Sequence, residues 1–252
     1  MPRRARKPSE SGIYHIMLRG INRQVIFEDD EDREKFIETI LRYKSISNYE
    51  LYGYCLMDNH VHLLIKETSE PISMIMKRIG SSYVYWYNRK HERCGHLFQE
   101  RFKSEAVESE AYFLTVLRYI HRNPLKAGLI KNIEEYKWSS INEYLDKQIV
   151  VDTGFTLKIL SEDRTEAVEL FRQYMNEYNE DKCLENEEKH LISDQEVISY
   201  FAQYDIININ ELKKLEKSKR NKIIGAVKSK KGVTIRQLSR ITGISKSVIE
   251  RI

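Results

Sequence analysis

The spacing of apolar residues along the first half of the chain predicts strands that alternate with helices. Short runs rich in β-branched and aromatic residues predict strands at 12–19, 51–57, 61–66 and 98–107. Apolar residues at near-helical spacing predict helices at 29–47, 71–89 and 109–122. The two central runs flank a short polar turn, which predicts a hairpin. The resulting order of elements is β-α-β-β-α-β-α.

Apart from its last helix, this order is that of the ferredoxin-like fold, an α+β arrangement in which an antiparallel sheet carries helices on one face. We expect this domain to occupy residues 1–145. Residues 146–208 are helical in pattern with acidic surfaces, and 176–189 is polar enough to be a linker. A domain boundary at 145 implies that a fragment ending near residue 150 folds alone.

The last segment, 209–252, predicts a small all-α unit. Residues 234–241 have the pattern of one short helix, 242–244 contain a glycine suited to a turn, and a second helix follows Ser245 as its N-cap. This is the form of a helix-turn-helix, in which the second helix reads DNA. Many small helical hairpins share that spacing, so the pattern by itself indicates a helical pair.

Charge is distributed unevenly along the chain, although the net charge is only +4. Residues 211–252 hold thirteen Lys and Arg against three Glu, whereas 161–196 hold twelve Asp and Glu against four basic residues. Basic ends favour contact with a polyanion, because each neutralised phosphate releases counterions. A solvated basic face is the alternative for the tail. The candidate DNA contacts in the two ends are Arg3, Arg4, Arg6, Lys7, Arg236 and Lys246.

Composition narrows the class of protein further. A chain of 252 residues with 41% hydrophobic and 32% charged residues is typical of a soluble globular protein. The sequence contains no apolar stretch long enough to span a membrane and no signal peptide, so we expect a cytoplasmic location and no membrane partner. Three cysteines without a C-x-x-C pair argue against a disulfide framework or a zinc knuckle, and we expect free thiols.

Candidate chemistry begins at His60-Val61-His62, at the start of a predicted strand. Residues i and i+2 of a strand point to the same face, so two imidazoles project side by side. Together they can hold a divalent cation if a third group arrives from another element. Taken alone, the triplet is weak evidence for a metal site, because it is more typical of surface or structural histidines.

A third group is suggested by the last helix of the first half. Tyr119 and Asn123 are four residues apart and share a helix face, so a phenol and an amide oxygen can reach the same place. His121 is rotated by about 200° from Tyr119 and fits that place less well. A tyrosine on an amphipathic helix is ordinarily a core residue, and the neighbours of Tyr119 are what single it out.

Four segments of the chain, in the right order, resemble a known family. They are 14–20 (YHIMLRG), 57–64 (MDNHVHLL), 95–103 (GHLFQERFK) and 119–129 (YIHRNPLKAGL). They resemble the single-tyrosine HUH transposases of the insertion-sequence-200 type, and more closely their REP-associated branch. The resemblance covers roughly residues 10–145.

This resemblance implies a ferredoxin-like catalytic domain in which His60 and His62 bind Mg²⁺ or Mn²⁺ and Tyr119 is the nucleophile. Many relatives carry Gln four residues after the tyrosine, where this chain has Asn123, as in the REP-associated branch; the amide is the implied third ligand. Attack by Tyr119 on a phosphodiester gives a 5′-phosphotyrosine link and a free 3′-OH. No nucleotide cofactor is implied, and no phosphate-binding G-x-x-x-x-G-K-[ST] loop occurs.

The implied substrate is single-stranded DNA, folded into a hairpin. Aromatic residues for base stacking, which helix packing explains equally well, are Tyr83, Tyr85, Trp86 and Tyr87. Further candidate DNA contacts close to the chemistry are His15, Arg19, Arg23, Arg101 and Lys103.

Two other functions compete with transposition. One is a catalytically idle DNA-binding regulator that works through the basic ends; intact His60, His62 and Tyr119 argue against it. The other is a relaxase or replication initiator, which uses the same triplet, but the position of the tyrosine helix after the histidine strand favours the transposase order. The sequence leaves open whether the protein is a monomer or a homodimer.

Overall fold

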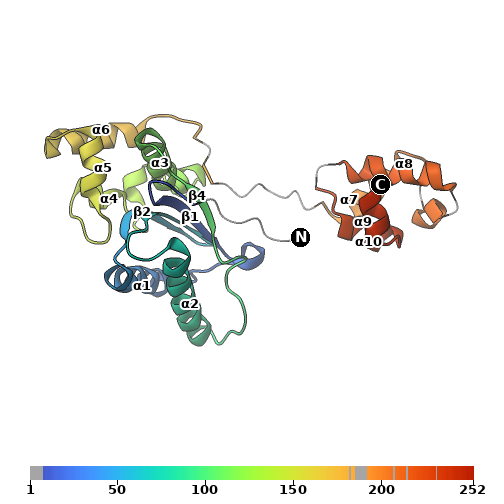
Figure 1. The fold of residues 1–252 in the computed structure, drawn as a ribbon, viewed down its shortest axis with the longest axis horizontal. Helices are drawn as coiled ribbons and strands as arrows, with labels where there is room; N and C mark the ends of the chain where they lie inside the picture. Colours follow the sequence, from blue (N-terminus) through green and yellow to red (C-terminus); the bar gives the residue numbers. More distant parts are fainter. Residues whose placement is uncertain (1–7, 182, 185–191, 207, 214, 231) are drawn as a thin grey trace. The chain divides into compact units, whose positions relative to one another are not determined.

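The structure is a computed structural model that describes residues 8–181, 183–184, 192–206, 208–213, 215–230 and 232–252. The chain divides into two compact units, residues 1–185 and 186–252 (Figure 1). Each unit has a hydrophobic core of its own. The Arg3, Arg4, Arg6 and Lys7 contacts expected from the sequence lie outside the described residues.

A four-stranded sheet organises the first unit. Its strands are β1 (Ile13–Arg19), β2 (Glu50–Met57), β3 (His60–Lys66) and β4 (Lys103–Ala106). They lie in the order β2-β3-β1-β4, and every neighbouring pair is antiparallel. This is the ferredoxin-like order, so the expected α+β fold is confirmed. The last strand is shorter than the expected run 98–107, because only a single bridge, Gly20 with Phe98, precedes Lys103 in the pairing with β1.

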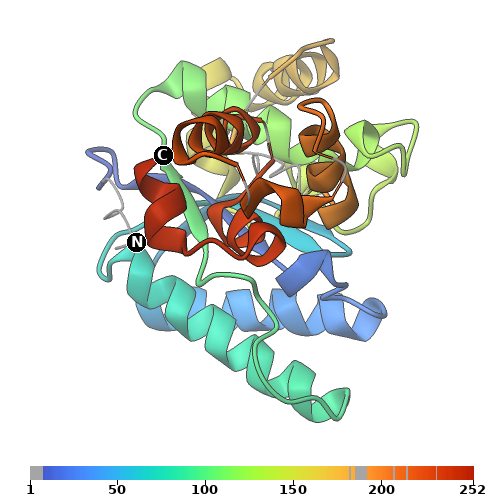
Figure 2. The ribbon, with the colours of Figure 1, turned by 90° about the vertical axis from the view of Figure 1, so that its right-hand side faces the viewer.

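Two long helices, α1 (Asp30–Ser47) and α2 (Ile72–Lys90), cover one face of the sheet (Figure 1 and Figure 2). The first begins at a capping box in which the Asp29 carboxylate accepts from the backbone N–H of Asp32 and the Asp32 carboxylate from that of Asp29. The second begins directly after Pro71, whose missing N–H is not needed there. These are the helices expected on one face.

The opposite face is covered by α3 (Glu110–Lys126). Gly53 in β2 permits the close approach, because a Cβ at this position would lie 2.5 Å from Leu117 Cδ1 of the helix. The backbone N–H of Tyr54 donates to Ser140 Oγ at 2.9 Å, which also fixes the segment after α3 on this face. Helices therefore cover both faces of the sheet, whereas the sequence pattern predicted helices on one face only.

Three further helices complete the first unit: α4 (Ile141–Leu145), α5 (Thr153–Leu160) and α6 (Arg164–Asn176). Short 3₁₀ turns occur at η1 (Ile21–Arg23) and η2 (Ile133–Glu135). The Phe171 ring of α6 stacks on Tyr144 with centroids 4.3 Å apart, and Val151, Leu157 and Met175 are buried in the same core. The division of the chain therefore falls near residue 185, not at the expected boundaries of 145 and 208.

The regular elements in the described residues of the second unit are all helices. Its elements are α7 (Asp194–Ala202), η3 (Ile209–Lys213), α8 (Lys217–Lys228), α9 (Ile235–Thr242) and α10 (Lys246–Arg251). The Thr234 hydroxyl caps α9 by accepting from the Gln237 N–H, and α9 ends at Gly243 in the left-handed conformation. Ser245 precedes α10 as expected but makes no capping bond; its hydroxyl lies 3.2 Å from that of Ser247. The pair of short helices expected from the sequence is present.

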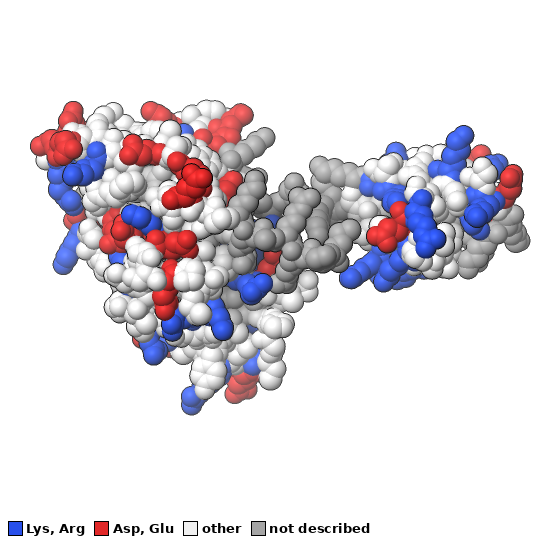
Figure 3. Space-filling view, viewed as in Figure 1, with Lys and Arg blue, Asp and Glu red and all other residues white. Residues whose placement is uncertain are grey.

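Lys and Arg side chains gather on the second unit (Figure 3). In the described part of the chain, no helix is both long and apolar enough to cross a membrane. Cys55, Cys94 and Cys183 carry free thiols, as expected.

Candidate active site

Strand pairing brings the candidate residues onto one face of the sheet. His60 and His62 of β3 lie opposite Arg19 and Met17 of β1. On its other edge β1 pairs with β4, so that Met17 lies opposite Lys103 and His15 opposite Glu105. Because side chains alternate along a strand and match across a register, these residues share the face that α3 covers. The charged and imidazole groups so gathered are His15, Arg19, His60, His62, Lys103 and Glu105.

Each imidazole of the histidine pair has one ring nitrogen engaged by a protein partner. His60 Nδ1 lies 2.6 Å from the Asn59 side-chain oxygen. His62 Nδ1 lies 2.9 Å from His15 Nε2. The His60 and His62 ring centroids are 5.1 Å apart, with the planes nearly perpendicular. The Nε2 atoms are therefore the nitrogens of this pair that are left to bind a ligand.

Burial keeps these rings neutral. It lowers the pKa of His60 to about 4, helped by the positive charge of Arg19 and opposed by Asp58. It also holds the pKa of His62 well below its ordinary value, with smaller contributions from His15 and His60, and lowers the pKa of His15 to about 3. Neutral imidazole is the form that binds metal ions. The pair is thus ready to act as a ligand at neutral pH.

Tyr119 enters this face from α3, whose first turn is capped by the Ser109 hydroxyl. Its ring is buried, 5% exposed, and lies edge-on to His62 with centroids 5.5 Å apart. One turn later, the Asn123 side-chain amide donates to the Tyr119 carbonyl at 2.8 Å. Two turns later, Lys126 Nζ lies 4.8 Å from the centre of the Tyr119 ring. Tyr119 and the histidine pair of the same chain are therefore neighbours.

The other candidate contacts are dispersed. Arg23 lies in the turn after β1 and Arg101 in the loop before β4, and both side chains are exposed. Arg236 of α9 and Lys246 of α10 are exposed on the second unit. Of the expected DNA contacts among the described residues, His15, Arg19 and Lys103 share the sheet face with the histidine pair.

Two of the four aromatic residues of α2 that were considered for base stacking are core residues. Tyr83 is fully buried and its hydroxyl donates to the Ile26 carbonyl at 2.6 Å, and Tyr87 is 1% exposed. For these two, the base-stacking expectation is wrong, because their rings fill the core between α2 and the sheet. Trp86 is partly buried beneath Lys90, whereas Tyr85 is 72% exposed and remains accessible to a base.

Three residues close to the site were not anticipated from the sequence. Asn59 contacts His60, Lys126 lies over the Tyr119 ring, and Glu105 lies opposite His15. Helical spacing could have indicated Lys126, because positions i and i+7 share a face. Glu105 could be found only from the pairing of β1 with β4.

Tyr112, the other tyrosine of α3, has a different environment. Burial raises its pKa, and a hydrogen bond from its hydroxyl to the Glu105 carboxylate raises the pKa further. Both effects disfavour the phenolate that attack requires. Tyr112 is therefore the weaker candidate nucleophile.

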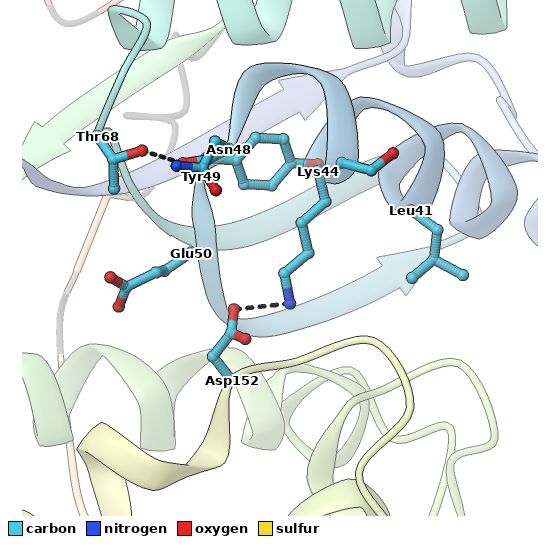
Figure 4. A pocket seen from close by; sticks show the side chains of 8 residues that line it. Leu41, Lys44, Asn48, Tyr49, Glu50, Thr68 and Asp152 are labelled. Atoms are coloured by element: carbon cyan, nitrogen blue, oxygen red, sulfur yellow. Dashed lines mark hydrogen bonds and ion pairs between the residues drawn. The ribbon is translucent and has the colours of Figure 1, made fainter.

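A hollow of about 390 Å³ lies at the opposite end of β2, where the strand begins (Figure 4). Its lining includes Lys44, Tyr49, Glu50 and Asp152, and the Lys44 and Asp152 charges pair at 2.7 Å. Glu50 is seven positions from Met57, the residue opposite His60, which is roughly 23 Å along a strand. This hollow is separate from the histidine pair.

Comparison with known proteins agrees with the geometry. Residues 9–123 match the family model described as "Transposase IS200 like". Among solved structures, the chain is similar to a REP-associated tyrosine transposase determined bound to a REP hairpin. The identity is 16% and the TM-score 0.50, over 61% of this chain and 93% of that one. Curated proteins give no match. Residues 9–123 of this chain are thus similar in sequence to the IS200-like transposases, and the chain shares the fold of a REP-associated tyrosine transposase.

Proposed function

We propose that this chain cuts and rejoins single-stranded DNA at a hairpin, with Tyr119 as nucleophile and a divalent cation held by His60 and His62. The observation that carries the proposal is the approach of the Tyr119 ring to the His62 ring, 5.5 Å between centroids, within one chain that has the family's fold. A nucleophile beside two neutral imidazoles that can bind a cation suits metal-assisted phosphoryl transfer.

Two imidazole nitrogens and an amide oxygen can hold a divalent cation, for which we propose Mg²⁺ or Mn²⁺. His60 and His62 both direct Nδ1 to a protein partner, which leaves Nε2 for a cation. In the described residues, no group of three or more His, Cys, Asp or Glu could hold a metal ion, and we propose a third protein ligand of another kind. Asn123 meets that need, because its Nδ2 is engaged by the Tyr119 carbonyl and its oxygen is left for a ligand. When bound, the cation polarises the scissile phosphate and stabilises the charge that develops on it.

The bond-making and bond-breaking steps use residues of the chain itself. The Tyr119 hydroxyl loses its proton as its oxygen attacks phosphorus and forms the new P–O bond. The bond from phosphorus to the 3′ oxygen breaks, and that oxygen takes up a proton to leave a 3′-OH. Lys126, 4.8 Å above the ring, favours negative charge on the phenol through its ammonium group. Reversal of the same step with a new 3′-OH rejoins the strand, so no energy source other than the phosphodiester is needed.

DNA contact is divided between the two units in this proposal. Arg19 and Lys103 lie beside the histidine pair, where they serve the phosphates next to the cut. Arg236 and Lys246, exposed on the α9–α10 pair of the second unit, contact DNA away from the cut as a helix-turn-helix does. The hairpin as substrate is carried over from the REP-associated transposase, which was determined with one.

The test is formation of a covalent protein–DNA adduct. The full chain is incubated with labelled hairpin-containing single-stranded DNA and Mn²⁺, and adducts are resolved on a denaturing gel. We expect an adduct from the wild type and none from Tyr119→Phe, which removes only the hydroxyl. Tyr85→Phe is the matched control, because Tyr85 is an exposed tyrosine outside the site. An adduct from Tyr119→Phe would contradict the assignment, and binding without any adduct would favour a DNA-binding regulator.

A further inference from the structure

His15 is a fully buried histidine that the proposed chemistry does not use directly. Its position in β1 is diagonal to His62, since Met17 is the residue opposite His62. An imidazole is long enough to bridge a diagonal pair of strand positions, and His15 Nε2 lies 2.9 Å from His62 Nδ1. The contact therefore joins the two strands directly beneath the candidate cation site.

On the other side of its ring His15 faces Glu105, and each of these residues has one polar atom without a hydrogen bond. His15 Nδ1 and Glu105 Oε2 are 3.9 Å apart, both buried, and within the described part of the chain neither has a hydrogen-bond partner. Leaving buried polar atoms unpaired is costly. Glu105 is also held by the Tyr112 hydroxyl, which donates to its carboxylate. A shift of about 1 Å would bring Glu105 within the usual N–H···O distance of His15 and would satisfy both atoms.

The direction of the hydrogen bonds follows from the acceptors. A carboxylate can only accept, so the favourable tautomer of His15 carries its proton on Nδ1, facing Glu105. Its Nε2 then accepts from His62 Nδ1–H, which leaves the lone pair of His62 on Nε2. The opposite direction would place two acceptors, His15 Nδ1 and the carboxylate, face to face and a proton on His62 Nε2.

We propose that Glu105, His15 and His62 form a hydrogen-bonded chain that fixes the tautomer and orientation of His62, so that its Nε2 lone pair faces the cation site. His15 and Glu105 are positioning residues that act through His62. The role in cation binding rests on the function proposed above, whereas the tautomer of His62 does not depend on it.

The tautomer can be measured directly. Nitrogen-15 NMR of the histidine side chains in the cation-free full chain should show His62 and His15 protonated at Nδ1 and not at Nε2. In His15→Leu, which removes the acceptor, His62 should lose this preference. His15→Gln keeps an acceptor near the Nε2 position and should restore it. A wild-type His62 that carries its proton on Nε2 would overturn the proposal.

The effect on cation binding is measured by calorimetric titration of the full chain with Mn²⁺. We expect His15→Leu to weaken binding roughly 10–100-fold, the usual range for groups that orient a metal ligand, with most of the affinity restored in His15→Gln. Glu105→Ala, at a side chain that is 37% exposed, should fold and weaken binding in the same direction. His121→Leu is the control: His121 is equally buried but bonds Ser140, and its loss should leave the affinity unchanged.

The outcomes separate the two proposals. Unchanged Mn²⁺ affinity in folded His15→Leu and Glu105→Ala would overturn the positioning role and leave the cation site standing. A wild type that binds no Mn²⁺ would remove the cation from the proposed function and with it the role in cation binding, while the NMR result still decides the tautomer.

Discussion

The extent of the hydrophobic core in the first unit predicts which truncated fragments of the chain can fold. Residues 153–176 form α5 and α6, and their apolar side chains lie in the same core as the sheet. A fragment ending at 150 lacks these helices, whereas one ending at 185 keeps them. We expect the longer fragment to fold and the shorter one to fail.

The size of the effect follows from burial. Val151, Leu157, Phe171 and Met175 are at most 4% exposed, and burying such a side chain contributes roughly 1.5–3 kcal/mol. Their loss removes on the order of 6–12 kcal/mol as an upper estimate. A domain is stable by only about 5–15 kcal/mol in total. The deletion also exposes Tyr144, which stacks on Phe171.

Urea unfolding followed by tryptophan fluorescence measures this, because both fragments retain the two tryptophans, Trp86 and Trp138. The fragment ending at 185 should unfold in one cooperative transition. The fragment ending at 150 should show no such transition, or one at far lower urea. Equal midpoints and equal slopes for the two fragments would refute the reasoning and restore a boundary near 145.

Three further predictions concern packing, charge and pH. Gly53→Ala should destabilise the first unit by about 1–3 kcal/mol, since its Cβ meets Leu117; unchanged urea unfolding would contradict the close approach. A fragment ending at 185 should bind single-stranded DNA with a shallower salt dependence than the full chain; equal slopes in fluorescence anisotropy would mean that the basic tail does not touch this DNA. The free energy of unfolding should fall as pH drops below about 6.5, because the unfolded chain takes up protons that buried His15 and His121, each with a folded pKa of about 3, do not accept. The loss should approach about 1.4 kcal/mol per pH unit for each group; stability that is constant from pH 7 to 5 would contradict it.

Local patterns were enough to predict the elements that position the site. The i, i+2 spacing of His60 and His62 and the i, i+4 spacing of Tyr119 and Asn123 are properties of single elements, so they can be read without knowing what packs where. The order of the sheet follows from the order of its elements, because few topologies suit it.

What the sequence did not predict depends on contacts between distant segments. The contact of His15 with His62 requires the register of β1 on β3, and its approach to Glu105 requires that of β1 on β4. The packing of α6 into the first core was not predicted, because acidic residues dominate its sequence. Its buried residues include Phe171 and Met175. The sequence pattern indicated helices with acidic surfaces in this region, but not which core they would join.

The short distance between the rings of Tyr119 and His62 also bears on how the reaction depends on dilution. Both residues belong to one chain, and α3 is tied to its own unit by the bonds of Arg118 with Glu177 and Asp181. In the proposed function the site is completed within one polypeptide, so dilution of the protein does not take it apart. Adduct formation on saturating DNA should then be first order in protein, with the same turnover per molecule at nanomolar as at micromolar concentration.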